Sequence, residues 1–412
     1  MANVSSSNGL EKRPKLRFPS FDEPWEENEL SHYLVENTER NRGLAFGKED
    51  VLSVSGEYGV INQIAFQGRS FAGESVADYH VVETDDIVYT KSPLKANPYG
   101  IIKVNKGIPG IVSTLYAVYH PLNTVAPRFV DLYFANDLRL NKFLKPLVNI
   151  GAKHDMKVNN SFVLTGTVVF PSIGEQQKLV DFFAKLDRRI EAQRKIVDAL
   201  KKYKRGLLSR KFAPITHDTS NIEYEGKILD FFSLSSGSTP SSTNKSFYSG
   251  SIRWVSSGEL KPKYLCETNQ HISAEAVSSC NLREYPENTL LIAMYGLEAA
   301  GVRGTASILN VPATISQACM AIQQTGEIDI EYLYYWYIYN GPWIGIKIAQ
   351  GTKQQNLSTE TLGNLKIYAP SYSKQKEVCK LLSQIDNLIE KESQKIDLLY
   401  AVKKGLLQQL FI

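Results

Sequence analysis

Residues 171–212 read PSIGEQQKLVDFFAKLDRRIEAQRKIVDALKKYKRGLLSRKF, and this stretch recurs at residues 370–411 at a constant offset of 199 positions. Thirteen of the 42 positions are identical, and the match needs no gap. The same offset pairs Trp25-Glu26 with Tyr224-Glu225. A match at one fixed offset indicates duplication of a structural unit. We therefore predict two copies of one unit within the 412 residues, each a globular part followed by a helix.

Both copies of the repeat carry apolar residues at alternating spacings of four and three positions, the pattern of a coiled-coil seam. Ser172 followed by Glu175 predicts a capping box at the start of the first helix. Gly206 and Gly405 are expected to interrupt the helices near their C-terminal ends. The seam residues are Leu179, Phe183, Leu186, Ile190, Val197 and Leu200 in the first copy, and Leu382, Ile385, Ile389, Ile396 and Leu399 in the second.

Two polar residues, Gln193 and Glu392, occupy seam positions near the middles of the helices. A seam tolerates a few polar residues, and a buried polar layer can instead set the register of the helices. The sequence leaves both interpretations open. If the helices run antiparallel about a pseudo-two-fold axis, these two side chains would meet at the centre. Each helix of about 40 residues would be roughly 60 Å long, a rigid spacer between two globular parts.

The globular parts contain short strand-like runs separated by Gly, Pro, Asn and Ser, for example residues 86–90, 110–119 and 288–295. The aromatic run at 332–339 (YLYYWYIY) predicts a buried helix. The predicted fold class is mixed α/β, with two globular α/β domains in tandem repeat, joined by two long antiparallel coiled-coil helices with pseudo-two-fold symmetry. The predicted domains are a polar tail at 1–16, globular domains at 17–165 and 213–365, and helices at 166–212 and 366–412.

Composition excludes several classes of protein. The four cysteines are isolated and the six histidines are scattered, so neither a disulfide scaffold nor a zinc site is predicted. The polar N-terminus does not resemble a signal peptide, and no run of about 18 apolar residues predicts a membrane helix. We therefore expect a cytoplasmic protein without a metal site.

Charge is distributed unevenly along a chain whose net charge is only +4. Residues 171–212 carry twelve Lys and Arg against five Asp and Glu, whereas residues 370–412 carry seven against five. These segments contribute +7 and +2, which leaves about −5 for the rest of the chain. The basic run at 201–205 (KKYKR) is either a solvated helix face or a strip that faces DNA or an acidic partner.

Polar clusters beside glycines or at strand ends are the candidate contacts with nucleic acid. Lysines suit phosphates, whereas Gln and Asn suit adenine edges. A Gly-x-Lys pattern at 151–153 recurs at 351–353, close to the offset of the repeat. Taken singly, each cluster is also explained as an ordinary solvated turn. The candidates are Lys91, Ser92, Lys153, Ser238, Thr239, Tyr295, Lys353, Gln354, Gln355 and Asn356.

The repeat itself resembles a known family. The run PSIGEQQKL at 171–179, followed by LDRRIE at 186–191 and KRGLL at 204–208, resembles the central conserved region of type I restriction specificity subunits. Residues 370–412 resemble their distal conserved region. PKLRFP at 14–19 resembles the start of these subunits, and SGSTP at 236–240, WVSSGEL at 254–260 and GTKQQNL at 351–357 resemble their second target-recognition domain. The chain departs from the family at 236–238, where Ser-Gly-Ser stands in place of the common Gly-Gly.

The resemblance implies a non-catalytic, sequence-specific DNA-binding subunit of a type I restriction–modification complex. Each target-recognition domain would read one half of a bipartite, asymmetric site on double-stranded DNA. The helix pair would fix the unread gap and dock two methyltransferase subunits, to which restriction subunits add in the full complex. No cofactor is expected in this chain, because S-adenosylmethionine would bind the methyltransferase subunit that carries out DNA methylation.

Enzyme motifs in the chain are incomplete. Residues 97–99 (NPY) lack the second proline of an amino-methyltransferase motif. Residues 43–48 (GLAFGK) are one residue short of a P-loop, and Glu49 stands where a Ser or Thr is required. Two other hypotheses remain: a coiled-coil scaffold whose globular ends bind protein, and a stand-alone DNA-binding protein, which the lack of a helix-turn-helix pattern disfavours. DNA binding with and without a methyltransferase partner would separate them.

Overall fold

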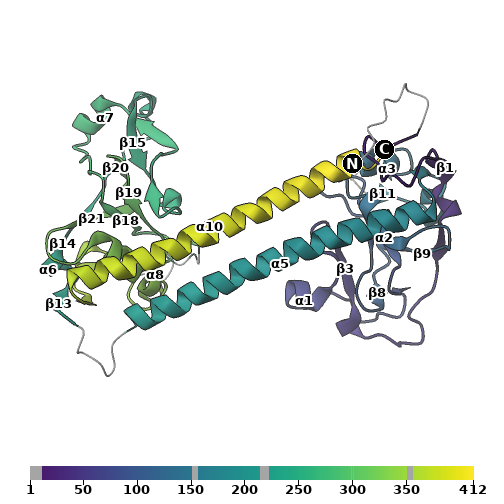
Figure 1. The fold of residues 1–412 in the computed structure, drawn as a ribbon, viewed down its shortest axis with the longest axis horizontal. Helices are drawn as coiled ribbons and strands as arrows, with labels where there is room; N and C mark the ends of the chain where they lie inside the picture. The colour runs from purple at the N-terminus through teal and green to yellow at the C-terminus, as the bar shows by residue number, and fades with distance from the viewer. Residues whose placement is uncertain (1–11, 151–155, 214–221, 298, 300, 350–355) are drawn as a thin grey trace. The chain divides into compact units, whose positions relative to one another are not determined.

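The computed structural model describes residues 12–150, 156–213, 222–297, 299, 301–349 and 356–412 (Figure 1). The chain forms two compact units: unit 1 is Met1–Gln193 with Gln394–Ile412, and unit 2 is Arg194–Ser393. Each unit therefore contains one globular part and portions of both long helices. None of the helices in the described ranges is long and apolar enough to cross a membrane.

The two long helices are α5 (Ile173–Phe212) and α10 (Tyr372–Gln409). In unit 1, Phe183 of α5 contacts Phe411, with ring centroids 6.2 Å apart, and Asp187 pairs with Lys403 of α10 at 2.5 Å. As the residue number rises from 183 to 187 in α5, the number of the contacting residue falls from 411 to 403. The two helices are therefore antiparallel in unit 1.

Unit 2 contains the same contact between the helices. Lys204 of α5 pairs with Asp386 of α10. The offset of 199 relates Asp187 to Asp386 and Lys204 to Lys403, so the two ion pairs are copies of each other. Antiparallel long helices and mixed α/β globular parts confirm the predicted fold class.

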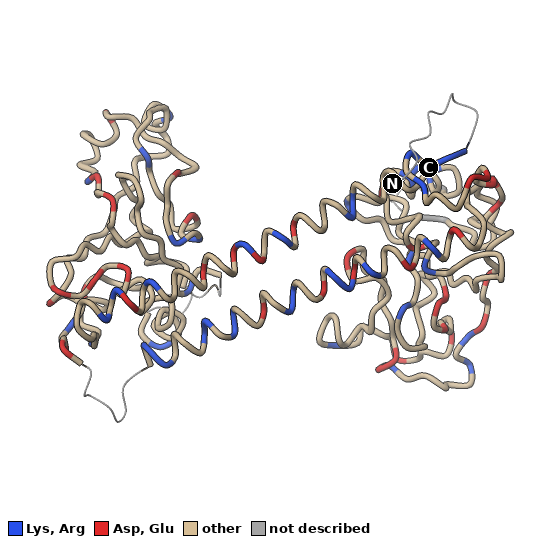
Figure 2. The backbone as a smooth tube through the Cα atoms, in the orientation of Figure 1, with Lys and Arg blue, Asp and Glu red and all other residues tan. Residues whose placement is uncertain are grey.

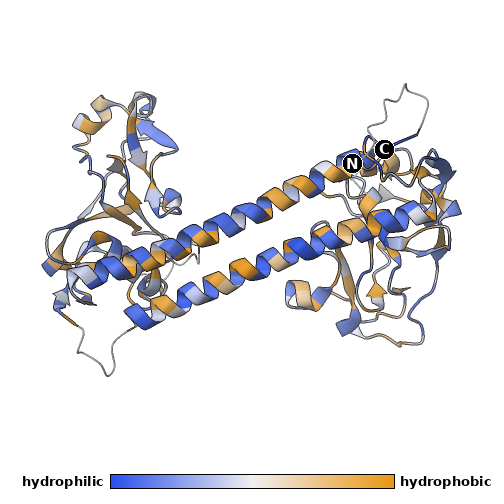
Figure 3. Ribbon diagram, in the orientation of Figure 1, coloured by the Kyte–Doolittle hydropathy of each residue, from blue (hydrophilic) through white to orange (hydrophobic). Residues whose placement is uncertain are grey.

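The side chains at the seam positions are buried or half-buried along both helices. Figure 3 shows how apolar and polar residues alternate along α5 and α10. Gln193 and Glu392 are both half-buried. They belong to different units, so their contact with each other stays a prediction.

Both helices continue through Gly206 and Gly405, so the expected interruptions are wrong. Glycine costs only about 1 kcal/mol in a helix interior. Burial of a large apolar side chain contributes about 1.5–3 kcal/mol. Leu208 and Phe212 are buried in unit 2, and Leu410 and Phe411 in unit 1, so packing holds the last turns despite the glycines.

Unit 1 is built on an antiparallel sheet of order β2-β9-β6-β7, formed by Leu34–Asn37, Tyr116–Pro121, Ile87–Thr90 and Ile101–Val104. Its strands alternate between two cores. Ile87 and Tyr89 belong to the core that includes α2 (Pro127–Tyr133) and α3 (Asp137–Leu144). Val88 packs in a second core with Leu52 and Val112.

The remaining elements of unit 1 are short. The hairpin β3–β4 (Leu52–Ser55, Gly59–Asn62) leads into α1 (Gln63–Gln67), and α4 spans Asn160–Val163. The other antiparallel pairs are β1–β12 (Glu26–Glu29, Thr167–Phe170), β5–β8 (His80–Val82, Gly110–Val112) and β10–β11 (Asn149–Ile150, Met156–Lys157).

Unit 2 contains a sheet of order β14-β21-β18-β19-β16, whose first four strands repeat the order found in unit 1. These strands are Phe232–Ser236, Cys319–Gln324, Leu290–Ala293, Ala306–Leu309 and Tyr264–Leu265. Helix α8 (Ile330–Lys347) packs on β18 and β19 and contains the run 332–339, which confirms the predicted buried helix.

A smaller sheet of unit 2 has the order β17-β15-β20, formed by Gln270–Ile272, Ile252–Val255 and Thr314–Ile315. The pair β13–β22 (Tyr224–Lys227, Lys366–Ala369) corresponds to β1–β12 of unit 1. The remaining helices are α6 (Ile228–Phe231), α7 (Ala274–Ser279) and α9 (Thr359–Gly363). The sequence predicted helices over 166–212 and 366–412. The first residues of these ranges instead form the strands β12 and β22, and the helices begin after them.

A buried glutamine fixes the start of each long helix to its globular part. Gln176 accepts a hydrogen bond from the backbone N–H of Ala126 at 2.9 Å and donates to the carbonyl of Pro171 at 2.9 Å. Gln375 does the same with Asp329 at 2.8 Å and Pro370 at 2.9 Å. Because both side chains are fully buried, their bonds satisfy backbone groups that water cannot reach.

The first long helix also forms a bidentate ion pair at this point. The carboxylate of Glu175 accepts hydrogen bonds from Nε and Nη2 of Arg17 at 2.9 and 2.7 Å. The carboxylate of Glu175 is therefore bound by Arg17, and the capping box with Ser172 stays a prediction. Lys374 replaces this glutamate in the second copy, so the bidentate contact is specific to unit 1.

Candidate nucleic-acid interface

Several loops of unit 2 meet where β14, β18 and β15 end and β21 begins. The N–H of Met294 donates to the carbonyl of Ala318 at 2.9 Å, and the N–H of Leu357 donates to the carbonyl of Met294 at 2.8 Å. The N–H of Ser238 donates to Ile315 at 3.1 Å. A further bond, from the N–H of Ser316 to the carbonyl of Val255 at 2.9 Å, links the end of β15. Together these bonds bring residues 236–239, 256–258, 294–296, 316–318 and 356 into one surface, which we call the unit 2 edge.

Four of the sequence candidates lie on the unit 2 edge. Thr239 is exposed, and Ser238, Tyr295 and Asn356 are half-buried. Gly237 permits the close approach of the loops, since a Cβ there would lie 2.2 Å from the carbonyl oxygen of Ile315. Lys353, Gln354 and Gln355 fall outside the described residues.

Unit 1 has an equivalent surface at the ends of β2 and β6. The N–H of Lys91 donates to the carbonyl of Leu115 at 3.3 Å, the counterpart of the bond from Met294 to Ala318. We call residues 38–40, 91–92, 113–115 and 159–160 the unit 1 edge. Lys91 and Ser92 are both half-buried on it, and Lys153 lies outside the described residues.

The ammonium group of Lys91 is already engaged within unit 1. Its Nζ donates to Oδ1 of Asn160 at 3.2 Å, and Nδ2 of Asn160 donates to Oε1 of Glu36 at 3.0 Å. Burial lowers the pKa of Lys91, and the nearby Arg40 lowers it further, while Glu36 opposes both effects. The cluster combines charges of both signs, so Lys91 acts within a network rather than as a free cation.

The sequence did not single out several residues of these edges. Arg40 and Thr114 on the unit 1 edge, and Gln317 on the unit 2 edge, are absent from the candidates. Each follows or precedes a short strand without a neighbouring Gly-x-Lys pattern. The matching strand order of the two sheets is the signal that identifies them, because equivalent strand ends then lie on equivalent edges.

Basic residues recur along α5 (Figure 2). Within the run 201–205, Lys201, Lys202 and Arg205 are exposed. Lys204 instead pairs with Asp386, and its Nζ lies 5.6 Å from the ring centroid of Tyr335. Of the four basic residues in the run, one therefore packs between the helices and three face solvent.

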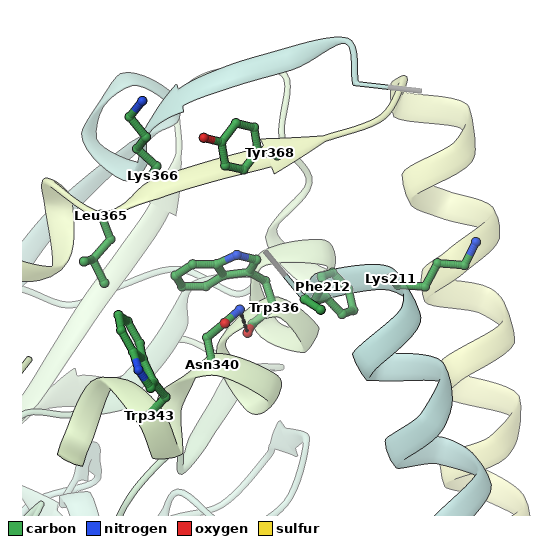
Figure 4. Close-up of a pocket in the computed structure, with 9 residues that line it drawn as sticks. Lys211, Phe212, Trp336, Asn340, Trp343, Leu365, Lys366 and Tyr368 are labelled. Carbon is green, nitrogen blue, oxygen red and sulfur yellow. Dashed lines mark hydrogen bonds between the residues drawn. The ribbon is translucent and has the colours of Figure 1, made fainter. Parts of the chain in front are cut away.

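A hollow of about 260 Å³ lies beside the C-terminal end of α5 in unit 2 (Figure 4). Phe212, Trp336, Trp343 and Tyr368 contribute aromatic surface to it. In unit 1, at the equivalent end of α10, the guanidinium of Arg139 lies 5.5 Å from the ring centroid of Phe411. The hollow presents a mainly apolar surface, to which Lys211 and Lys366 add positive charge.

Asp329, Glu331 and Cys379 in unit 2 place oxygen and sulfur atoms close together. Lys376 pairs with Asp329 at 2.6 Å, and Lys263 pairs with Glu331. Burial raises the pKa of the Cys379 thiol, which keeps it protonated. The two ion pairs place a lysine beside each carboxylate of the cluster and so supply its counter-charges.

Comparison with known proteins finds similarity to one family over part of the chain. Residues 221–400 match the family described as the type I restriction modification DNA specificity domain. The chain is 29% identical over 190 residues to the type I restriction enzyme MjaIX specificity subunit of Methanocaldococcus jannaschii, covering 45% of the chain and 43% of that relative. It is 26% identical over 155 residues to the EcoR124I/EcoR124II specificity subunit of Escherichia coli, covering 37% and 38%.

The aligned regions span less than half the length of these curated relatives. Solved structures share the fold over far more of the chain. The S subunit of a type I restriction–modification system from M. genitalium has a TM-score of 0.56 at 14% identity, covering 97% of this chain and 99% of that one. A chain from a structure of complex assembly and conformational transition of the type I R-M system has a TM-score of 0.61 at 15% identity, covering 94% and 97%.

The solved structures share the fold of the chain, and residues 221–400, less than half of the chain, match the DNA specificity domain. Over less than half of its length the chain is similar in sequence to type I restriction specificity subunits.

Proposed function

We propose that this chain is the non-catalytic DNA-recognition subunit of a type I restriction–modification complex. Each unit reads one half of a bipartite, asymmetric site on double-stranded DNA. The observation that carries the proposal is the pair of edges, which share backbone hydrogen bonds but differ in side chains, Lys91 and Thr114 against Met294 and Gln317. One scaffold with two different surfaces suits a site whose halves differ in sequence.

The partners follow from the same proposal. Two methyltransferase subunits bind the helix pair, and restriction subunits join in the full complex. The chain itself needs no cofactor, since S-adenosylmethionine binds the methyltransferase subunit. The complex acts on DNA in the cytoplasm. The family match disfavours the alternatives of a protein-binding scaffold or a stand-alone DNA-binding protein.

The test is single-molecule methylation sequencing of DNA from a host that expresses this chain with its methyltransferase subunit. We expect methylated adenines in one split motif of two unlike halves separated by a fixed gap. Purified complex should also bind a duplex with that motif more tightly than a scrambled duplex. Absence of any split motif together with equal binding to both duplexes would refute the proposal.

Matched insertions test whether the helix pair sets the gap. Inserting seven residues after Gln193 and seven after Glu392 adds one heptad to each helix and preserves the seam. Each helix lengthens by about 10.5 Å, which corresponds to about three base pairs of duplex. The tolerated gap should grow by that amount while both half-sites stay the same. The control is the insertion in α5 alone, which disrupts the pairing of the helices and should abolish methylation.

A further inference from the structure

The turn at residues 316–318 forms the middle of the unit 2 edge and is fixed by backbone hydrogen bonds. The N–H of Ser316 donates to the carbonyl of Val255 at 2.9 Å, and the N–H of Cys319 donates to the carbonyl of Ser316 at 3.0 Å. The carbonyl of Ala318 accepts from Met294 at 2.9 Å. Since Ser316 and Cys319 are buried, the two residues between them are held on a rigid support.

Gln317 is the residue that this support presents. Its own N–H donates to Oγ1 of Thr239 at 3.4 Å, which ties the turn to the loop after β14. The side chain of Gln317 is exposed. Its side-chain amide, unlike its backbone N–H, forms no hydrogen bond with the residues that the structure describes. An exposed amide on a fixed turn can form two directed hydrogen bonds with little loss of conformational entropy of the backbone.

The described groups that share the unit 2 edge with Gln317 are mainly hydroxyls and amides, and the nearby carboxylate of Glu259 is engaged by the N–H and hydroxyl of Ser256 at 2.9 and 2.8 Å. Ser238, Thr239 and Tyr295 supply hydroxyl groups from neighbouring loops. Oδ1 of Asn356, on the same edge, is shielded from solvent and has no hydrogen-bond partner among the described residues. Hydroxyl and amide groups suit the edges of bases, whereas phosphates attract Lys and Arg.

We propose that Gln317 reads an adenine in the half-site bound by unit 2. Its Nε2 donates to N7 of adenine, and its Oε1 accepts from the N6 amino group, the bidentate contact that a glutamine makes in the major groove. This assignment rests on the proposed function. It adds the residue and the base through which one of the two units selects its half-site.

Unit 1 carries no matching amide at this position. Lys91 and Leu115 correspond to Met294 and Ala318 through the same backbone bond, so Thr114 corresponds to Gln317. A threonine hydroxyl cannot make the two parallel hydrogen bonds of a glutamine amide. The adenine contact is therefore specific to one half-site.

The experiment compares Gln317→Ala with wild type in complex with the methyltransferase subunit. Competition binding uses duplexes in which each base pair of the methylated motif is changed in turn. We expect Gln317→Ala to lose discrimination by roughly 10- to 100-fold at one A·T pair in one half-site and to keep it elsewhere. Methylation sequencing should show the motif relaxed at that same position. Gln324→Ala, at the opposite end of β21, is the matched control and should leave the motif unchanged.

A second variant keeps the test independent of stability. Gln317→Glu retains the acceptor, loses the donor and favours the amino group of cytosine, so the preferred base at that position should shift. An unchanged motif in both variants, relaxation at several positions, or a loss of binding to every duplex well beyond 100-fold would overturn the assignment. If wild type itself methylates no split motif, the proposed function fails as well, so the two failures are distinguishable.

Discussion

The unit 1 edge and the unit 2 edge share a backbone and differ in chemistry. In both, the residue that follows β6 or β18 donates to the carbonyl of the residue immediately before β9 or β21. Lys91 of unit 1 is tied into a charged network with Asn160 and Glu36, whereas the unit 2 edge presents hydroxyls and the amide of Gln317. Backbone hydrogen bonds and buried packing therefore keep the scaffold the same in both units. The side chains on the surface of the two edges can differ without changing that scaffold.

The ends of the long helices offer a second comparison between the units. Phe411 enters an aromatic cluster in unit 1, with ring centroids 6.0 Å from Trp25 and 5.6 Å from Phe129. Phe212, its counterpart, packs against Tyr332 in unit 2 with centroids 5.0 Å apart. Both side chains are buried, but the first has more ring contacts among the described residues.

The largest expected effect comes from removing these two rings. Phe411→Ala should destabilise unit 1 by about 4–5 kcal/mol, and Phe212→Ala should destabilise unit 2 by about 3 kcal/mol, because each leaves a cavity in a core. Hydrogen exchange measured by mass spectrometry reports the two units separately. Tyr203→Ala, at an exposed position of α5, is the control and should change little. Equal losses in both units from either variant would contradict the assignment of each ring to its own core.

The next largest effect is a loss of stability at low pH, which should be greater in unit 1 than in unit 2. Burial lowers the pKa of His80 in unit 1 to about 4, with further lowering by Arg40 and Lys91. Because the unfolded chain binds the proton near pH 6.5, unit 1 is stabilised above that pH and loses stability as pH falls from 6.5 towards 4. We expect a loss of about 2 kcal/mol in unit 1 between pH 7 and 4.5.

The control for this effect is His80→Asn, which removes the titrating group. Its stability should change less over the same pH range, as measured by hydrogen exchange in β5 and β6. Hydrogen exchange in unit 2 should change less than in unit 1 over the same pH range, because His80 lies in unit 1. A wild-type pH profile that the substitution leaves intact would assign the acid sensitivity to other groups.

The smallest expected effect concerns the two repeated ion pairs. Asp187 is 48% exposed, so Lys403→Met should cost about 0.5 kcal/mol. Lys204 is 18% exposed and lies over the ring of Tyr335, so Lys204→Met should cost about 1 kcal/mol. Double-mutant cycles with Asp187→Asn and Asp386→Asn measure each pair directly. Equal coupling energies would mean that the extra aromatic contact in unit 2 contributes nothing.

Much of the fold was predictable because it depends on local periodicity. The seam residues recur at four and three positions, and the run at 332–339 is apolar on all sides, so both helices and α8 follow from sequence alone. The role of Gln176 and Gln375 was visible only as a repeated identity. Their partners Ala126 and Asp329 lie about 50 residues away, where spacing carries no information.

The edges were harder to predict for the same reason. Ser238, Thr239, Tyr295 and Asn356 come together through bonds between loops that are distant in sequence. Lys91 looks like a free cation in the sequence, and only the structure reveals its contact with Asn160. Gln317 has no motif around it, so its exposed position on a fixed turn could not be inferred.

The aromatic cluster around Phe411 has a consequence for the order in which the protein matures. Unit 1 includes residues 394–412, and its core contains Leu410 and Phe411. A ribosome therefore makes all of unit 2 before it supplies the side chains that complete unit 1. Until then the core of the first globular part lacks Phe411, and Trp25 and Phe129, which contact that ring, are incompletely covered. A chaperone that binds nascent chains could bind these exposed rings during that interval.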